Sequence, residues 1–318
     1  MSHRRRRLDR RILSKPPGRA YVPALALTAL GGAAALSHEL IWTRRLTDLL
    51  GTSVEASARV FGCFFLGLAL GSAWASLRVA GTRHPWRATA AIEAAVALLS
   101  LPILGLPEWT GWMWPAIGPE ALIGPLGWTL KWLVSVLVIL PPAVAMGAVL
   151  PFLAAATLGG ERSFQRAGVW LYAANTLGGV VGLVATTLVA LPTLGAPGSL
   201  LVAMGVNLAL AAFLLWVDFR QAGLTLPPPR AQESVRPVGL SPGPAFLAFF
   251  SGAGVLAAEI MALELVMLVA PISLYGQAAV LTAVILDRTA ALIAPFLRMR
   301  ATHLGSRLPG LLSAGGQC

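Results

Sequence analysis

The chain has 318 residues, of which 57% are hydrophobic and only 12% charged, and its mean hydropathy is +0.75. A soluble domain needs charged side chains over most of its surface, so this balance excludes an ordinary soluble protein and predicts a polytopic membrane protein. The formal net charge of +11 would suggest a nucleic-acid partner in a soluble protein. Membrane topology explains the distribution of arginine better, so we expect no nucleic-acid partner.

Eight apolar segments are each long enough to cross a bilayer. A backbone inside lipid must satisfy its own hydrogen bonds, so these segments are expected to be helices. The predicted fold class is therefore all-α, a polytopic transmembrane helical bundle of about eight spans. The predicted spans are 21–38, 56–79, 86–106, 128–157, 169–191, 198–217, 244–270 and 272–296.

The basic residues predict the orientation of these spans. Most of the 24 Lys and Arg lie in residues 1–20, in alternate loops and in the C-terminal tail. The loops predicted on the opposite side, at 107–127, at 192–197 and around residue 271, contain none, and Arg44 and Arg45 are the exceptions, being predicted outside. Cytoplasmic loops carry an excess of Lys and Arg. The sequence therefore predicts a multi-pass protein of the cell membrane with both termini in the cytoplasm.

An internal repeat divides the chain. A shift of 220 positions aligns the first predicted span with the seventh without a gap and places Glu39 on Glu259 and Gly32 on Gly252. Such repeats are the usual plan of secondary transporters. The expected units are a basic cytoplasmic tail at 1–20, a six-span unit at 21–217, a Pro-rich cytoplasmic linker at 218–243, a partial second repeat of two spans at 244–296 and a cytoplasmic tail at 297–318.

The second unit is shorter than the first, and two interpretations stay open. The chain is either a six-plus-two bundle or a truncated or frameshifted copy of a longer protein. Residues 286–290, Leu-Asp-Arg-Thr-Ala, stand where the first unit has a run of small residues. Charges at mid-bilayer are costly, so spans seven and eight are the least certain to insert.

Six motifs occur in a fixed order along the first unit. They are Glu39-x-x-Trp42-x-Arg44, Leu50-Gly-Thr-Ser-Val54, FFLGLALGS at 64–72, MGAVLP at 146–151, LYAANTLG at 171–178 and LPTLG at 191–195. In this order they resemble the membrane part of spermidine-synthase-like proteins, over roughly residues 24–217 and more weakly over 244–280. That resemblance implies a transporter-like bundle, which in the family is fused to a C-terminal aminopropyltransferase domain.

The chain offers no place for that catalytic domain. An aminopropyltransferase needs a soluble Rossmann-like domain with a Gly-rich turn after a strand, whereas GGVVG at 178–182 lies within a predicted membrane helix. The resemblance therefore implies a non-catalytic transmembrane module. Its expected partners are the lipid bilayer and either a soluble aminopropyltransferase-like protein or a second copy of the chain. Two alternatives stay open: a secondary transporter of a cationic or small polar solute such as a polyamine, and a truncated or split aminopropyltransferase.

The polar residues inside the apolar segments are the candidate binding groups. A carboxylate within a span is costly and marks a functional site by default. The side chains of Tyr172 and Asn175, three residues apart, share a helix face. The candidate polar membrane site consists of Glu39, Arg44, Glu93, Tyr172, Asn175 and Glu259. The two Cys and four His are scattered, so no metal or other cofactor is expected.

Two interpretations of the stretch HELIWTRRL at 38–46 stay open. In the first, Trp42 lies in the interfacial belt and an arginine, with Arg45 nearer in helical register than Arg44, pairs with Glu39 at an anchored helix end. In the second, Glu39 binds a cation or a proton inside the bundle, with Glu93 as a second carboxylate. The repeat of the glutamate at position 259 favours the second interpretation.

Small residues and prolines predict how the helices pack. Gly67 and Gly71, and likewise Gly178 and Gly182, each place two glycines on one helix face, which lets a neighbouring backbone approach closely. Prolines at 141, 142 and 151 are expected to break the fourth span. Such breaks either kink the helix or free carbonyl groups that line a cavity.

Overall fold

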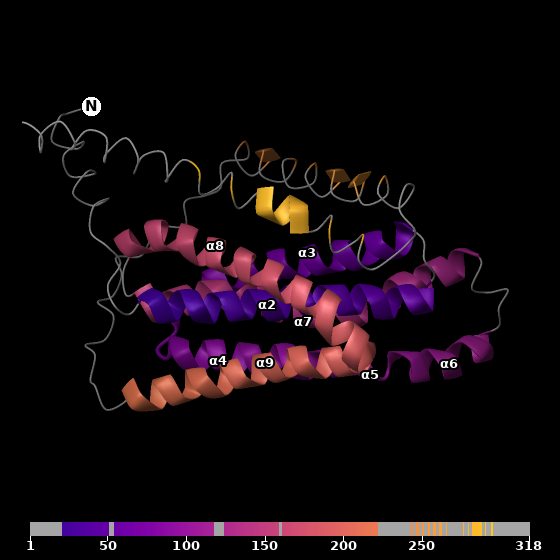
Figure 1. Cartoon of the computed structure of the whole chain (residues 1–318), viewed down its shortest axis with the longest axis horizontal. Helices are drawn as coiled ribbons and strands as arrows, with labels where there is room; N and C mark the ends of the chain where they lie inside the picture. The colour runs from indigo at the N-terminus through magenta and orange to yellow at the C-terminus, as the bar shows by residue number, and fades with distance from the viewer. Residues whose placement is uncertain are drawn as a thin grey trace, which may run out of the picture.

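The computed structural model describes residues 21–50, 54–117, 124–158 and 161–221, with scattered positions between 243 and 294. The described part is helical and contains no strand, which confirms the all-α class. Five of its helices are long and apolar enough to cross a membrane, and this indicates an integral membrane protein. Figure 1 shows the long helices lying roughly side by side along the long axis of the molecule.

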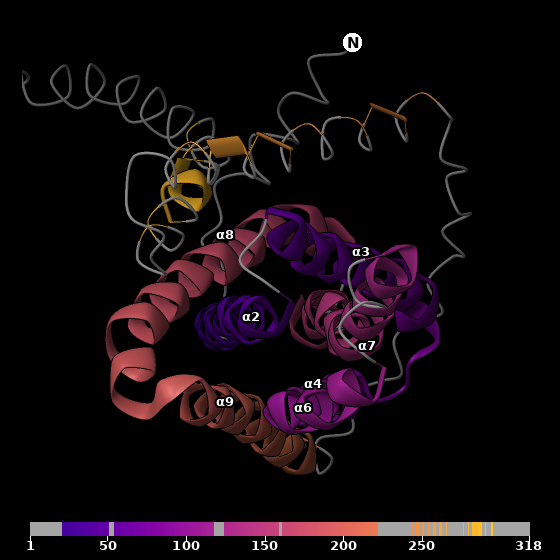
Figure 2. The same ribbon diagram turned by 90° about the vertical axis from the view of Figure 1, so that its right-hand side faces the viewer.

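Helix α2 (Tyr21–Leu50) is the central helix. Figure 2 shows it inside an arc formed by α8, α9, α4, α7 and α3. The helix extends beyond residue 38, where the predicted span ends, and continues through the whole HELIWTRRL stretch, which contains neither Pro nor Gly. Trp42 is fully buried rather than interfacial. Its ring lies 6.2 Å from that of Phe64 and 5.4 Å from that of His38.

The third predicted span divides into short helices. Helix α3 (Val54–Arg78) ends in a short 3₁₀ turn (Val79–Gly81) and is followed by α4 (Pro85–Leu99), α5 (Leu101–Leu104) and α6 (Leu106–Ile117). Pro102 and Pro107 each lie in the first turn of a new helix, where the missing N–H costs least. The predicted outer loop 107–127 therefore begins as a helix. The guanidinium of Arg45 donates a 2.7 Å hydrogen bond to the carbonyl of Leu104 at this break.

Helix α7 (Pro125–Leu158) contains all three prolines of the fourth predicted span and remains one helix. The expected break of the fourth span is therefore wrong, because the helix is continuous through all three prolines. A proline still removes one backbone donor, so the carbonyl four residues earlier loses its usual partner. For Pro151 this residue is Gly147.

The fifth apolar stretch, Gly168–Arg220, is 53 residues long, far more than one crossing needs. It comprises α8 (Glu161–Ala185), a π-helical turn (Thr186–Ala190) and α9 (Leu191–Gln221). The chain kinks at Gly195, whose φ of 66° is readily adopted by glycine. Figure 1 shows α9 running back alongside α4. The predicted segments 169–191 and 198–217 thus lie on the two sides of this kink.

Most of the predicted second repeat lies outside the described residues. This applies to Glu259, to residues 222–242 of the predicted linker and to most of spans 244–270 and 272–296, whereas residues 218–221 of that linker belong to α9. The eight spans and the internal repeat are therefore not confirmed. Residues 282–287 are described and are helical.

Glycines form two close helix contacts. A Cβ atom added at Gly178 or Gly182 of α8 would overlap the backbone of α2, at Ala29 and Ala33 respectively. Likewise, a Cβ added at Gly67 of α3 would overlap Ala143 of α7, and one added at Gly71 would overlap the backbone of Val144, also on α7. The four glycines named from the sequence thus lie where two backbones touch, one pair in each contact. A buried apolar cluster that includes Ile41, Trp42 and Phe64 joins α2 and α3 to residues of α4, α5, α6, α7 and α9.

Candidate functional site

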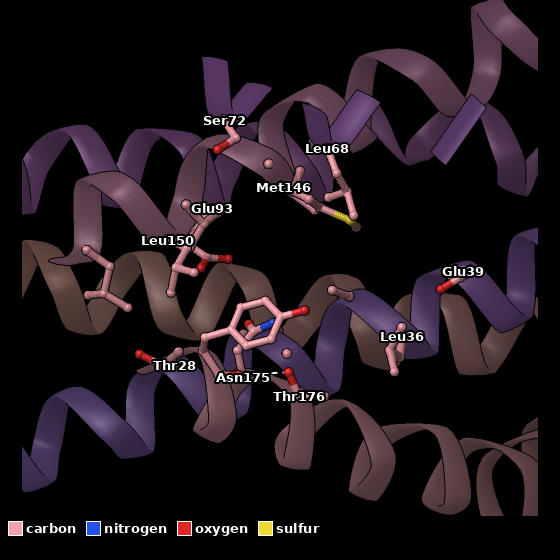
Figure 3. Close-up of a pocket in the computed structure, with 18 of the residues that line it drawn as sticks. Thr28, Leu36, Glu39, Leu68, Ser72, Glu93, Met146, Leu150, Asn175 and Thr176 are labelled. Carbon is pink, nitrogen blue, oxygen red and sulfur yellow. Dashed lines mark hydrogen bonds between the residues drawn. The ribbon is translucent and has the colours of Figure 1, made fainter. Parts of the chain in front are cut away.

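A cavity of about 370 Å³ lies inside the bundle, a volume typical of small-molecule sites. Its wall is mostly apolar and comes from α2, α3, α4, α7, α8 and α9, with Ile285 from the C-terminal part of the chain. Figure 3 draws the side chains that line it. The polar side chains of the wall are Thr28, Glu39, Ser72, Glu93, Tyr172, Asn175, Thr176 and Asn207.

Four of the residues predicted from the sequence line this one cavity. Glu39 comes from α2, Glu93 from α4, and Tyr172 and Asn175 from α8. The two glutamates are only 2% and 3% exposed. Figure 3 places them on opposite sides of the view, with Asn175 between them. Segments far apart in the sequence therefore meet at one polar site.

The carboxylate of Glu93 belongs to a buried hydrogen-bonded chain. Its Oε2 atom accepts a 2.7 Å hydrogen bond from Nδ2 of Asn207 on α9. The Oδ1 atom of the same amide accepts a 2.9 Å hydrogen bond from Nε2 of His38 on α2. Asn207 and His38 are 3% and 0% exposed, so three helices are tied together at this level.

Glu93 reaches α2 as well as α9. A Cβ atom added at Gly31 would lie 3.7 Å from Oε1 of Glu93, which is ordinary van der Waals contact. The second carboxylate oxygen therefore faces α2 where that helix has no side chain. In the described part of the chain, no Lys, Arg or His side chain forms an ion pair with Glu93.

The arginines that follow Glu39 lie elsewhere. Arg44 is exposed and is not part of the cavity wall. Arg45 donates to the Leu104 carbonyl, so the hydrogen bond that the structure gives it joins α2 to α5. This contact arises where the break between α4 and α6 leaves a carbonyl group close to the guanidinium of Arg45.

Backbone groups add to the polar character of the wall. Pro151 and Gly147 of α7 both line the cavity. Since Pro151 has no N–H, the Gly147 carbonyl lacks its intrahelical donor and can accept a hydrogen bond from a bound molecule. On α8 the side chain of Tyr172 is 53% exposed, so the cavity wall on this side reaches the surface of the bundle.

The wall is acidic and has no basic side chain among its described residues. Its ionisable groups are Glu39, Glu93 and Tyr172. In the described ranges no group of three or more His, Cys, Asp and Glu is arranged to hold a metal ion. Acidic groups on an otherwise apolar wall favour a cationic guest with a hydrocarbon body.

Sequence reasoning missed two members of the site, His38 and Asn207. A signal for Asn207 was present, because an Asn within a membrane span is costly unless it is hydrogen-bonded, and that rule had already selected Asn175. His38 stands next to Glu39 in the stretch HELIWTRRL but has no partner close in sequence. Only the packing of α9 on α2 brings the two residues together.

No protein-family model, no curated protein and no solved structure matches this chain. The class of protein is therefore defined by the fold alone, as an all-helical integral membrane protein with a polar cavity.

Proposed function

We propose that the chain is a multi-pass protein of the cell membrane, with both termini cytoplasmic, that binds a small cationic solute in the cavity and carries it across the bilayer. The observation that supports this function is the environment of Glu93. Its carboxylate is buried, accepts its hydrogen bond from a neutral amide, and faces a cavity whose described wall has no basic side chain. A charge in that position is stable only with a counter-charge, which a cationic solute supplies.

The positions of the two glutamates suggest the shape of the solute. The Oε1 atom of Glu93 faces α2 at the level of Gly31, and Glu39 follows eight residues later on the same helix. With a rise of 1.5 Å per residue, these levels are about 12 Å apart. Apolar side chains such as Met146 and Leu68 line the cavity between its ends. A linear amine with separated charges, such as a polyamine, fits this arrangement.

The test is uptake of radiolabelled spermidine into liposomes that contain the purified full chain. Wild-type protein is expected to give saturable uptake, and Glu93→Gln is expected to lower it at least tenfold. Glutamine keeps the size of the side chain and its oxygen still accepts from Asn207, so the fold is expected to survive. The matched control is Glu108→Gln, which removes an exposed carboxylate of α6 outside the cavity and should leave uptake unchanged.

A second function is supported by the position of the motifs. Several of the segments that carry the resemblance to spermidine-synthase-like proteins contribute residues to the cavity wall, including Glu39, Phe64, Met146 and Asn175. This supports a membrane module of that kind, which anchors or assembles with an aminopropyltransferase-like partner or a second copy. The same experiment separates the two functions. If Glu93→Gln reduces only the amount of folded protein, and wild type transports no amine, the transporter is refuted and the module is retained.

A further inference from the structure

The hydrogen bonds around Asn207 have a fixed direction. The amide oxygen Oδ1 is an acceptor only, so Nε2 of His38 must carry the hydrogen of their 2.9 Å contact. The Nδ2 group is a donor only, so Oε2 of Glu93 must accept. The three side chains therefore form one polarised chain in which hydrogen is donated from α2 through α9 to α4.

This direction determines the charge of His38. Its other ring nitrogen, Nδ1, is buried and has no hydrogen-bond partner within the described part of the chain. A protonated imidazole carries a hydrogen on both nitrogens, and a second buried N–H without an acceptor would be strongly unfavourable. His38 is accordingly neutral and acts as a positioning residue, which holds the Asn207 amide with its donor toward Glu93.

The same direction determines where Glu93 can take a proton. In a neutral carboxylic acid the carbonyl oxygen accepts hydrogen bonds better than the hydroxyl oxygen, and Oε2 already accepts from the Asn207 amide, so the proton is favoured on the other oxygen. The remaining oxygen, Oε1, faces Gly31 and the cavity. The geometry thus leaves one oxygen available both for a proton and for a cation.

We propose that Oε1 of Glu93 is an exchange site that releases one proton for each cationic solute bound, which makes the transport in the proposed function a proton-coupled exchange. The inference rests on that function and adds the coupling ion. In the step, the O–H bond of the neutral carboxylic acid breaks, the proton passes to water, and the resulting carboxylate pairs with the ammonium group of the solute. Solute and proton never occupy Oε1 together, which is the condition for exchange.

Few other titratable groups face Glu93. From α2 they are His38 and Glu39, and from α8 the one on the cavity wall is Tyr172. Within the described residues, α7 carries only Lys131, which is outside the wall, and Arg59 of α3 is also outside it. On α9 the carboxylate of Asp218 pairs with Arg87 of α4, eleven residues beyond Asn207. Arg87 lies six residues before Glu93 on α4, about 9 Å along the helix, and neither it nor Asp218 is part of the cavity wall.

The experiment measures spermidine binding and Glu93 protonation in the same samples of purified full chain. Spermidine is fully protonated in mildly acidic solution, so its own amines do not titrate there. Infrared difference spectra report the C=O stretch of a neutral carboxylic acid, and an indicator dye in weak buffer reports protons released. We expect about one proton per bound spermidine, loss of the carboxylic acid band on binding, and an affinity that rises about tenfold per pH unit while Glu93 is protonated.

Variants of the chain show which carboxyl group gives the infrared band and the released proton. Glu93→Gln should abolish the band and the proton release, whereas Glu39→Gln and the exposed control Glu108→Gln should keep the band. His38→Leu should keep the band but weaken the pH dependence, because the amide is then free to turn. Binding of spermidine without proton release, or a band that persists in Glu93→Gln, overturns the exchange and leaves the proposed function intact. Absence of saturable binding overturns both.

Discussion

The contact of α2 with α8 predicts that Gly178→Ala destabilises the bundle relative to Gly205→Ala. Both glycines lie inside helices, so both substitutions gain the same helix propensity, about 1 kcal/mol. A Cβ at Gly178 overlaps the carbonyl oxygen and carbonyl carbon of Ala29, whereas a Cβ at Gly205 on α9 meets nothing within 4 Å. The difference between the two variants therefore isolates the overlap.

Backbone atoms cannot turn aside as a flexible side chain can, so α8 must move away from α2 to accept the methyl group. A gap of 0.5–1 Å already removes a quarter to a half of the dispersion attraction along a contact. Overpacking of this kind costs about 1–3 kcal/mol. We expect Gly178→Ala to be less stable than Gly205→Ala by that amount.

The assay is reversible unfolding in mixed detergent micelles with increasing SDS, followed by circular dichroism. Gly182→Ala is a second test of the same contact, because its Cβ would overlap the backbone of Ala33. If both variants are as stable as Gly205→Ala, the backbones of α2 and α8 do not touch at these positions. In that case the placement of Asn175, whose carbonyl a Cβ at Gly32 would overlap, would also have to be revised.

Two further predictions concern polar contacts at other levels of the bundle. The side chain of Asp218 is 10% exposed and pairs with Arg87. A double-mutant cycle with Arg87→Ala and Asp218→Asn should therefore give a coupling free energy of about 1 kcal/mol. A coupling free energy of zero would show that the pair is not formed. Arg45→Met should lower the free energy of unfolding by about 0.5–1.5 kcal/mol through loss of the hydrogen bond to Leu104, while Arg78→Met at the exposed end of α3 should change it little. If Arg45→Met is as stable as Arg78→Met, the predicted contribution of the hydrogen bond between Arg45 and Leu104 is refuted.

The helical class was predictable because lipid leaves the backbone few alternatives. Helix ends were harder to predict. The sequence interpretation ended the first span near residue 38, where polar residues begin, whereas α2 continues to Leu50 and the side chains of His38 and Trp42 contact α9 and α3. The burial of Trp42 depends on neighbouring helices, which no single segment of the sequence encodes.

The polar residues of the cavity were predictable one at a time and not as a set. The cost of an ionisable group in lipid identified Glu39 and Glu93, and helix register identified Tyr172 with Asn175. Their convergence depends on which helices are neighbours, and this follows from long-range packing. The same limit applies to the contacts of Arg45. Local register cannot indicate that the arginine meets the Leu104 carbonyl from another helix.

Adjacent glycines on α2 have different roles, and this difference links packing to the site. Gly32 has no room for a side chain, since a Cβ there would overlap the carbonyl of Asn175. It therefore fixes α8 against α2 and sets the depth of Asn175 in the cavity. One residue earlier, Gly31 has room, because a Cβ would reach only ordinary contact with Oε1 of Glu93. The open space at Gly31 is what lets that oxygen face the cavity. The close contact at Gly32 and the open space at Gly31 together shape an acidic pocket whose wall is mostly apolar.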